Sequence, residues 1–170
     1  MSGMRAGGLA QALRTTHRAG GITALDIGPA LGDPVTLSEI AALLCDVDYL
    51  IGNAHEIEAL TGSHDCEAGG RELQEAGARH VVIKRGADGA SLRGEEGPVD
   101  VPGFTVDANI SVGAGDAFNA GFLYGVWRKW SYERAMRYGC AVAALMVSGE
   151  QGVMDAPTSA EVEAFLATRA

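Results

Sequence analysis

The sequence is short of basic residues, cysteines and long apolar runs, and each shortage excludes a class of protein. The 13 lysines and arginines stand against 22 aspartates and glutamates, a net charge of −9, which argues against a nucleic-acid surface. The 3 cysteines are widely spaced and odd in number, so free thiols in a reducing cytoplasm fit better than a disulfide framework. No signal-peptide pattern is visible, and no apolar run reaches the roughly 18 residues that cross a bilayer. We therefore expect a cytoplasmic protein with neither a nucleic-acid nor a membrane partner.

Several chemical signatures are also missing. The sequence has no Gly-x-x-x-x-Gly-Lys-Ser/Thr phosphate loop and no Gly-x-Ser-x-Gly nucleophile turn. Its 4 histidines show no metal-ligand spacing, so we expect each of them at the surface or partly buried. Four large aromatic residues are expected to serve core or interface packing rather than base stacking: Phe118, Phe122, Trp127 and Trp130.

The chain does have enough apolar content for a core. With 170 residues, 47% of them hydrophobic, it is sized for one domain. Apolar strands alternate with amphipathic helices, which predicts an α/β fold. We expect strands at residues 22–25, 47–51, 80–84, 90–93 and 98–101, and helices at 9–18, after Thr36, at 54–60, 67–77, 114–127 and 131–147, and after Thr158. The third and fourth strands should form a hairpin, and we predict a single domain over residues 1–170.

The strongest chemical signal is the glycine turn Gly113-Ala114-Gly115 followed by Asp116. The turn opens a predicted helix, whose first N–H groups and positive dipole end favour an anion. Prearranged donors of this kind stabilise the charge that grows on oxygens during phosphoryl transfer, and a neighbouring carboxylate can accept the proton of an attacking hydroxyl. Asp116 is our candidate catalytic base. The structural alternative is a glycine loop whose aspartate only complements the helix dipole.

A second signal is the pair Asn53 and Glu56. Asn53 ends a predicted strand and Glu56 lies one helical turn further on, so both side chains can face one edge of the sheet. An amide and a carboxylate there could order the water shell of a phosphate-bound Mg²⁺. Asn-x-x-Glu is also a helix-capping pair, and these residues alone favour the cap.

A third signal is Lys84 with Gly86, after the predicted strand at residues 80–84. Lys84 brings positive charge to the carboxyl end of a strand, where α/β sheets bind ligands. An ordinary hairpin turn would explain the glycine equally well.

Taken together, and in their order along the chain, the three segments resemble the ribokinase-like (PfkB-type) carbohydrate kinase family. The most specific part is GAGDAFNAGF at residues 113–122, and the resemblance extends over about residues 25–165. It implies a three-layer α/β/α sheet and a kinase that uses ATP and Mg²⁺ on a sugar-like small molecule. It also implies that residues 141–152 flank the adenine.

The resemblance gives each signal a role. The turn of Gly113, Ala114 and Gly115 corresponds to the family's anion hole and Asp116 to its catalytic base. Two further pairs carry the cofactors: Asn53 and Glu56 with Mg²⁺ through water, and Lys84 and Gly86 beside the nucleotide.

Two departures limit what carries over. The family usually has Asp-Thr where this chain has Ile110 and Ser111, and that stretch helps to form a monovalent-cation site. Potassium activation is therefore left open, with Asp107 and Asn109 as nearby oxygen-bearing alternatives. Family members are also nearly twice as long, and the N-terminal strands and lid that make most sugar contacts have no counterpart here. Because half a sheet leaves a strand edge unpaired, we predict self-association or a complementary N-terminal chain.

The sequence as a whole predicts an ATP-dependent carbohydrate kinase that transfers the γ-phosphate to a sugar hydroxyl. The alternative is a truncated, non-catalytic module that binds nucleotide or serves only as an interaction domain. The acceptor sugar is not identified by any of these residues.

Overall fold

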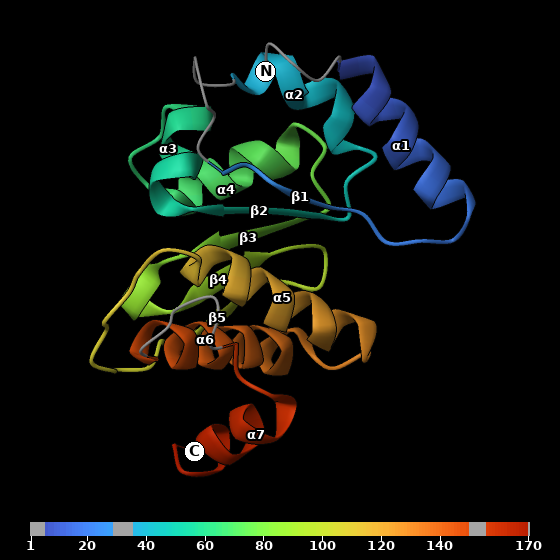
Figure 1. Cartoon of the computed structure of the whole chain (residues 1–170). Coiled ribbons are helices and arrows are strands. Elements are labelled where there is room, and N and C mark those ends of the chain that lie inside the picture. Colours follow the sequence, from blue (N-terminus) through green and yellow to red (C-terminus); the bar gives the residue numbers. More distant parts are fainter. Residues whose placement is uncertain (1–5, 29–35, 150–155, 170) are drawn as a thin grey trace. The chain divides into compact units, whose positions relative to one another are not determined.

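The chain folds as an α/β protein, and its computed structural model describes residues 6–28, 36–149 and 156–169 (Figure 1). Two compact units are distinguished: Met1–Lys84 with Leu92–Pro98, and Arg85–Ser91 with Val99–Ala170. Five strands are hydrogen-bonded in the order β1-β2-β3-β4-β5. The single domain predicted over residues 1–170 stays a prediction.

The first unit alternates strands and helices, as the sequence predicted. Its elements are α1 (Ala6–Arg18), β1 (Ala24–Asp26), α2 (Leu37–Leu44), β2 (Tyr49–Asn53), α3 (Ala54–Thr61), α4 (Cys66–Glu75) and β3 (His80–Lys84). The predicted strand 80–84 has the observed bounds, whereas the predicted strands at 22–25 and 47–51 lie about two residues too early.

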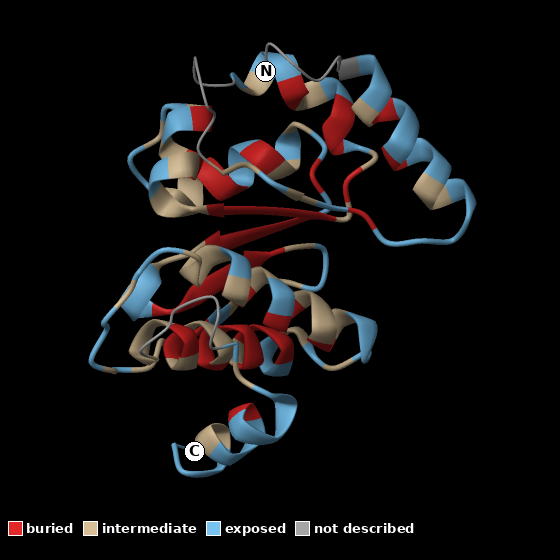
Figure 2. Ribbon diagram, viewed as in Figure 1, coloured by how far each residue is buried: buried red, intermediate tan, exposed pale blue. Residues whose placement is uncertain are grey.

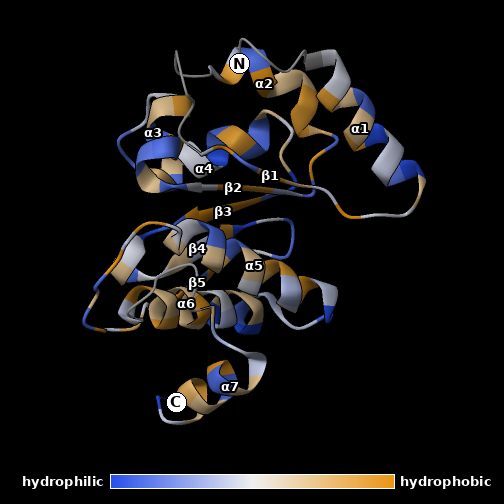
Figure 3. Ribbon diagram, viewed as in Figure 1, coloured by the Kyte–Doolittle hydropathy of each residue, from blue (hydrophilic) through white to orange (hydrophobic). Residues whose placement is uncertain are grey.

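The three strands of this unit are parallel, and β2 and β3 are buried up to their last residue, whereas β1 is partly exposed. Tyr49 pairs with His80, and Asn53 pairs with Lys84, so β2 and β3 run side by side over their whole length. Leu50, Val81 and Ile83 face a core made with α1 to α4, and Figure 2 shows β2 and β3 buried except at their carboxyl ends. Figure 3 shows the same two strands as apolar, which is typical of parallel strands covered on both faces.

Helices α2 and α3 begin at the capping residues that the sequence predicted, whereas α1 begins three residues earlier than expected and α4 one residue earlier. Thr36 and Glu39 form a capping box at α2, and Asn53 and Glu56 form another at α3. Gly62 ends α3 in the left-handed conformation that glycine adopts without steric cost. Short polar side chains therefore fix the boundaries, because they satisfy backbone groups that a helix end leaves without partners.

At the amino ends of the three strands, an amino-end network joins Thr23, Asp48, His17 and Arg79. The Asp48 carboxylate accepts the Thr23 N–H at 2.9 Å and Arg79 Nη1 at 3.0 Å, and its Oδ2 lies 2.9 Å from His17 Nε2. Burial by itself raises the pKa of Asp48, but hydrogen bonds from Thr23 and His17 outweigh it and hold the pKa below its ordinary value.

His80 was expected at the surface or partly buried. In the structure it is buried and stacks on Tyr49, which corrects that expectation.

The described residues of the second unit form a tight turn, the first half of β4, the strand β5 and three helices. Its elements are a 3-10 turn η1 (Gly86–Asp88), β4 (Ala90–Arg93, whose last two residues belong to the first unit), β5 (Val99–Val101), α5 (Ala114–Trp127), α6 (Tyr132–Ser148) and α7 (Ser159–Ala167). Arg85 N–H donates to the Gly89 carbonyl at 2.8 Å, which closes the predicted hairpin between β3 and β4.

Glycines let α5 and α6 pack at very close range. A Cβ at Gly121 would lie 2.8 Å from Gly139 Cα, and a Cβ at Gly139 would lie 2.9 Å from the Phe118 carbonyl oxygen. Side chains larger than hydrogen therefore do not fit along this seam, and the seam fixes α5 against α6. This matters for function because α5 begins at the predicted glycine turn.

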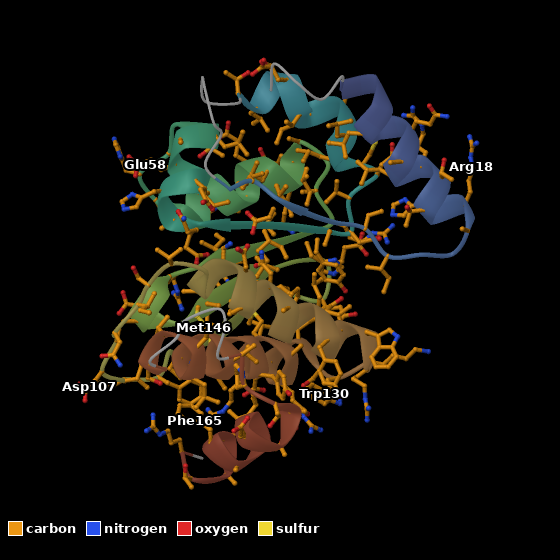
Figure 4. The ribbon with its side chains drawn as sticks, in the orientation of Figure 1. Arg18, Glu58, Asp107, Trp130, Met146 and Phe165 are labelled. Atoms are coloured by element: carbon orange, nitrogen blue, oxygen red, sulfur yellow. The ribbon has the colours of Figure 1, made fainter. Side chains whose placement is uncertain are left out.

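α7 and the ends of α5 and α6 share an aromatic cluster. Trp130 lies against Tyr138 with 5.2 Å between ring centroids, and Phe165 points from α7 toward α6 (Figure 4). Phe118 is buried as expected, whereas Trp127 is 70% exposed and is no core residue.

Burial raises the pKa of the Cys140 thiol on α6 to about 11, so this thiol is protonated at neutral pH. Among the described residues, none of the helices is both long and apolar enough to cross a bilayer.

Candidate active site

The carboxyl ends of the three parallel strands each finish in a polar residue. Asp26 is the last residue of β1, Asn53 of β2 and Lys84 of β3. Because parallel strands end at the same edge of a sheet, these side chains come together there, where α/β proteins bind ligands. With Glu56 they make up the carboxyl-end group of the first unit.

Lys84 reaches across the end of β2 to Asp26. Its ammonium Nζ lies 2.8 Å from Asp26 Oδ2, and the Lys84 side chain is only 13% exposed. The other carboxylate oxygen of Asp26 accepts the Gly28 N–H at 2.8 Å, which fixes the orientation of the carboxylate. The lysine that the sequence singled out is therefore held in an ion pair at the sheet edge.

Asn53 and Glu56 form the helix cap that the residues alone favoured. Asn53 Oδ1 accepts the Glu56 N–H at 2.9 Å, and the Asn53 N–H donates to Glu56 Oε2 at 2.6 Å. The cap uses one carboxylate oxygen of Glu56, and no hydrogen bond with another described residue involves the other oxygen, Oε1. Capping therefore fixes both side chains at the sheet edge and leaves Oε1 for a further ligand.

In the second unit, the glycine turn has the conformation that its sequence predicted. Gly113 is the N-cap of α5 with φ 87° and ψ −2°, a left-handed conformation that residues with a Cβ avoid. The Ala114 N–H donates to the Ser111 carbonyl at 3.2 Å, and the regular helical hydrogen bonds begin with Ala117 N–H to the Gly113 carbonyl at 2.9 Å.

Two amides lie between these two donors. The N–H groups of Gly115 and Asp116 belong to the first turn of α5, where a helix offers no carbonyl acceptor four residues back. Within the described part of the chain, neither makes a hydrogen bond. The helix dipole adds positive potential at the same place. The start of α5 therefore has the donors and the field that an oxyanion requires.

Asp116 is exposed, on the first turn of α5. Its side chain is therefore in contact with solvent. This is the arrangement that the base role requires, because the group must reach a hydroxyl that arrives from outside.

The structure brings the predicted residues together in two sets. Asn53, Glu56 and Lys84 meet at the edge of the first unit, and the residues of the turn, Gly113, Ala114, Gly115 and Asp116, meet at the start of α5 in the second. Gly86 belongs to the second unit, exposed and at φ 59° in the hairpin turn.

The remaining sequence predictions fall outside these sets. Asp107 projects outward from the loop before α5 (Figure 4), and the Asn109 amide donates to the Ser148 carbonyl at 3.0 Å. Of the expected adenine-flanking segment 141–152, residues 150–152 lie outside the described residues.

Sequence reasoning missed Asp26 as a site residue. Its position could have indicated a role, because Asp26 directly follows the predicted strand 22–25 and the other two parallel strands also end in polar residues. What the pattern could not give is that Lys84 pairs with this carboxylate across the intervening strand.

Comparisons with known proteins agree with this fold. Residues 2–159 match the pfkB family of carbohydrate kinases, and the chain belongs to that family. It is 37% identical over 156 residues to an ATP-dependent ribose-1-phosphate kinase of Halopiger xanaduensis, covering 92% of this chain and 50% of that protein. It is also 37% identical over 133 residues to a 5-dehydro-2-deoxygluconokinase of Geobacillus kaustophilus, covering 75% of this chain and 39% of the relative.

Solved structures give the same picture. The crystal structure of a ribokinase from Thermotoga maritima matches with a TM-score of 0.79 at 31% identity, over 92% of this chain and 52% of the ribokinase chain. The fold is therefore the ribokinase-like α/β fold over the part that this chain represents. The chain spans about half the length of the relatives it matches.

Proposed function

We propose that this chain provides the ATP-binding and phosphoryl-transfer part of a sugar kinase. The observation that carries the proposal is the start of α5. There a left-handed glycine N-cap presents the Gly115 and Asp116 amides at a helix N-terminus, directly beside an exposed carboxylate. Membership of a carbohydrate kinase family supports the same conclusion.

Each of the two sets of residues fits a part of a nucleoside triphosphate and its metal. The amides of Gly115 and Asp116 would bind phosphoryl oxygens, and Lys84 would supply a point charge to a phosphate. Glu56 Oε1 would face the water shell of Mg²⁺, with Asn53 holding the carboxylate in place through the cap. Gly86, in the exposed hairpin turn, would border the nucleotide.

Chemistry follows from these positions. In the proposed transfer, the acceptor oxygen would bond to the γ-phosphorus of ATP while the bond from that phosphorus to the β–γ bridging oxygen breaks, and ADP would leave. Asp116 takes the proton of the acceptor hydroxyl, so that the oxygen can attack as it loses the proton. The turn amides stabilise the negative charge that increases on the phosphoryl oxygens, and they need no reorganisation because α5 is fixed against α6 by the glycine seam.

The acceptor class is the part of the proposal that rests on relatives. The curated relatives act on ribose 1-phosphate and on a deoxygluconate, as their names state. We propose a sugar or sugar phosphate with a free hydroxyl. We also propose that the enzyme is soluble and cytoplasmic. Because β1 is an edge strand, we propose in addition that it pairs either with a second copy of this chain or with a complementary chain.

The test is a phosphotransfer screen of the whole chain. The chain is incubated with ATP, Mg²⁺ and a panel of ribose, fructose, ribose 1-phosphate and a nucleoside, and phosphorylated product is measured by ³¹P NMR. We expect Asp116→Asn to lower kcat by about 10² to 10⁴-fold, the usual contribution of a general base, while calorimetry gives an unchanged Kd for ATP.

Glu133→Gln is the matched control for this variant. Glu133 is an exposed acid in the first turn of α6, a helix that begins with Ser131 instead of a glycine turn. It should keep full activity. Turnover retained by Asp116→Asn would reject the base assignment. ATP binding without transfer by the unmodified chain would favour the second candidate, a non-catalytic nucleotide-binding module.

A further inference from the structure

The Asp26–Lys84 ion pair occupies the place where the proposed function needs a free cation. Lys84 is largely buried, so its ammonium has few positions available, and in this structure it lies 2.8 Å from Asp26 Oδ2. Asp26 is itself held by the Gly28 N–H. The pair is thus a fixed feature of the sheet edge, and an incoming phosphate would meet a lysine that already has a carboxylate partner.

The charges around this lysine are mostly negative. Asp26 and Glu56 both belong to the carboxyl-end group, and Lys84 is the one cation in it. A carboxylate and a phosphate compete for the same ammonium, and they also repel each other. At a separation of about 5 Å, repulsion between two such charges changes an equilibrium by about fourfold in bulk water and by more than a hundredfold at an effective dielectric of about 20. Because Asp26 is partly exposed, we expect a value between these limits, about tenfold.

We propose that Asp26 is a built-in competitor for Lys84 that makes the site select metal-bound over metal-free nucleotide. The inference rests on the proposed function, because it requires a phosphate at Lys84. Metal-free ATP carries its full negative charge to the carboxyl-end group, and Asp26 opposes it. A bound divalent cation removes two of those charges, so the magnesium complex meets much less repulsion from the same carboxylate.

The proposal makes Asp26 a specificity-determining residue rather than a catalytic one. Asp26→Asn keeps the side-chain oxygen that accepts the Gly28 N–H and removes only the charge. The variant should bind metal-free ATP more tightly and bind the magnesium complex with little change. A residue with a purely structural role would alter stability and leave this preference untouched.

The experiment is calorimetric titration of the whole chain with ATP, once with EDTA and once with excess Mg²⁺. The quantity compared is the ratio of the two Kd values. We expect Asp26→Asn to lower this ratio by about tenfold.

Asp46→Asn is the matched control, since Asp46 pairs with Arg14 in the same unit, away from the carboxyl-end group, at 3.6 Å. It should leave the ratio unchanged. An unchanged ratio in Asp26→Asn, or weaker binding of both forms, overturns the inference even if Asp116→Asn abolishes transfer as proposed. Absence of ATP binding by the unmodified chain and by every variant overturns the inference and the proposed function together.

Discussion

The two ends of strands β1, β2 and β3 carry similar residues and use them differently. At the amino ends, Thr23, Asp48 and Arg79 directly precede the three strands, and at the carboxyl ends Asp26, Asn53 and Lys84 are their last residues. Both ends contain an ion pair between an aspartate and a basic side chain. The ends differ in how the polar groups are satisfied.

In the amino-end network the chain supplies both donors and acceptors. Asp48 alone accepts from the backbone and hydroxyl of Thr23 and from Arg79, and it lies beside His17. At the carboxyl ends, the cap between Asn53 and Glu56 uses only one of the two Glu56 carboxylate oxygens. The partner of Lys84 there is the carboxylate of Asp26, which a phosphate could replace. From this comparison we propose that polar clusters of similar composition stabilise the fold at one end of the parallel sheet and bind ligand at the other.

The largest expected effect is on stability at the amino end. Asp48→Ala removes the acceptor for the N–H of Thr23, a residue that is only 4% exposed, and breaks the contacts with His17 and Arg79. We expect a loss of about 3 kcal/mol in the free energy of unfolding, because a buried donor is left without a partner. Urea unfolding followed by circular dichroism measures it.

Asp26→Ala is the paired measurement at the carboxyl end. The Asp26 side chain is 32% exposed, so water screens the pair on the carboxylate side and we expect a smaller loss, about 1 kcal/mol. Equal losses at the two ends would contradict the distinction between a structural and a ligand-binding cluster.

A smaller effect is expected on the pH dependence of stability. The pKa of Asp48 is lowered in the folded chain, so its contribution is fully present above the unfolded pKa of about 3.9 and is lost as the pH falls through the folded pKa. Between about pH 4 and pH 2, the unmodified chain should therefore lose stability more steeply than Asp48→Asn.

The comparison isolates one carboxyl group. The capping carboxyls Glu39 and Glu161, whose pKa values are lowered mainly by hydrogen bonds from Thr36 and Thr158, titrate in both proteins and cancel in the difference. Parallel pH profiles for the two proteins would show that Asp48 titrates as an ordinary exposed carboxyl.

Local signals gave much of the fold before the structure was known. The capping residues Thr36, Asn53 and Thr158 mark helix starts through a chemistry that acts over three residues, and all three helices begin where these predicted. The glycine turn could be predicted for the same reason, because its conformation depends on consecutive residues. The apolar run Val81, Val82 and Ile83 likewise identified the buried strand β3.

What could not be predicted depends on contacts between distant residues. The Asp26–Lys84 pair joins positions 58 apart in the sequence, and the partner of Lys84 follows only from the order of the strands. The seam between Gly121 and Gly139 needs the packing of two helices, and His80 is buried because Tyr49 lies beside it in the sheet. The exposure of Trp127 has no signal in the sequence around it.

The central claim is that the start of α5 binds a nucleotide's phosphate through backbone amides. The most direct measurement is a ¹⁵N–¹H NMR titration of the chain with ATP and Mg²⁺, which needs no acceptor sugar and no turnover. The account predicts saturable shifts of the Gly115 and Asp116 amides, larger than those of the Tyr132 and Glu133 amides at the start of α6. If ATP binds while the Gly115 and Asp116 amides stay unmoved, the claim is contradicted.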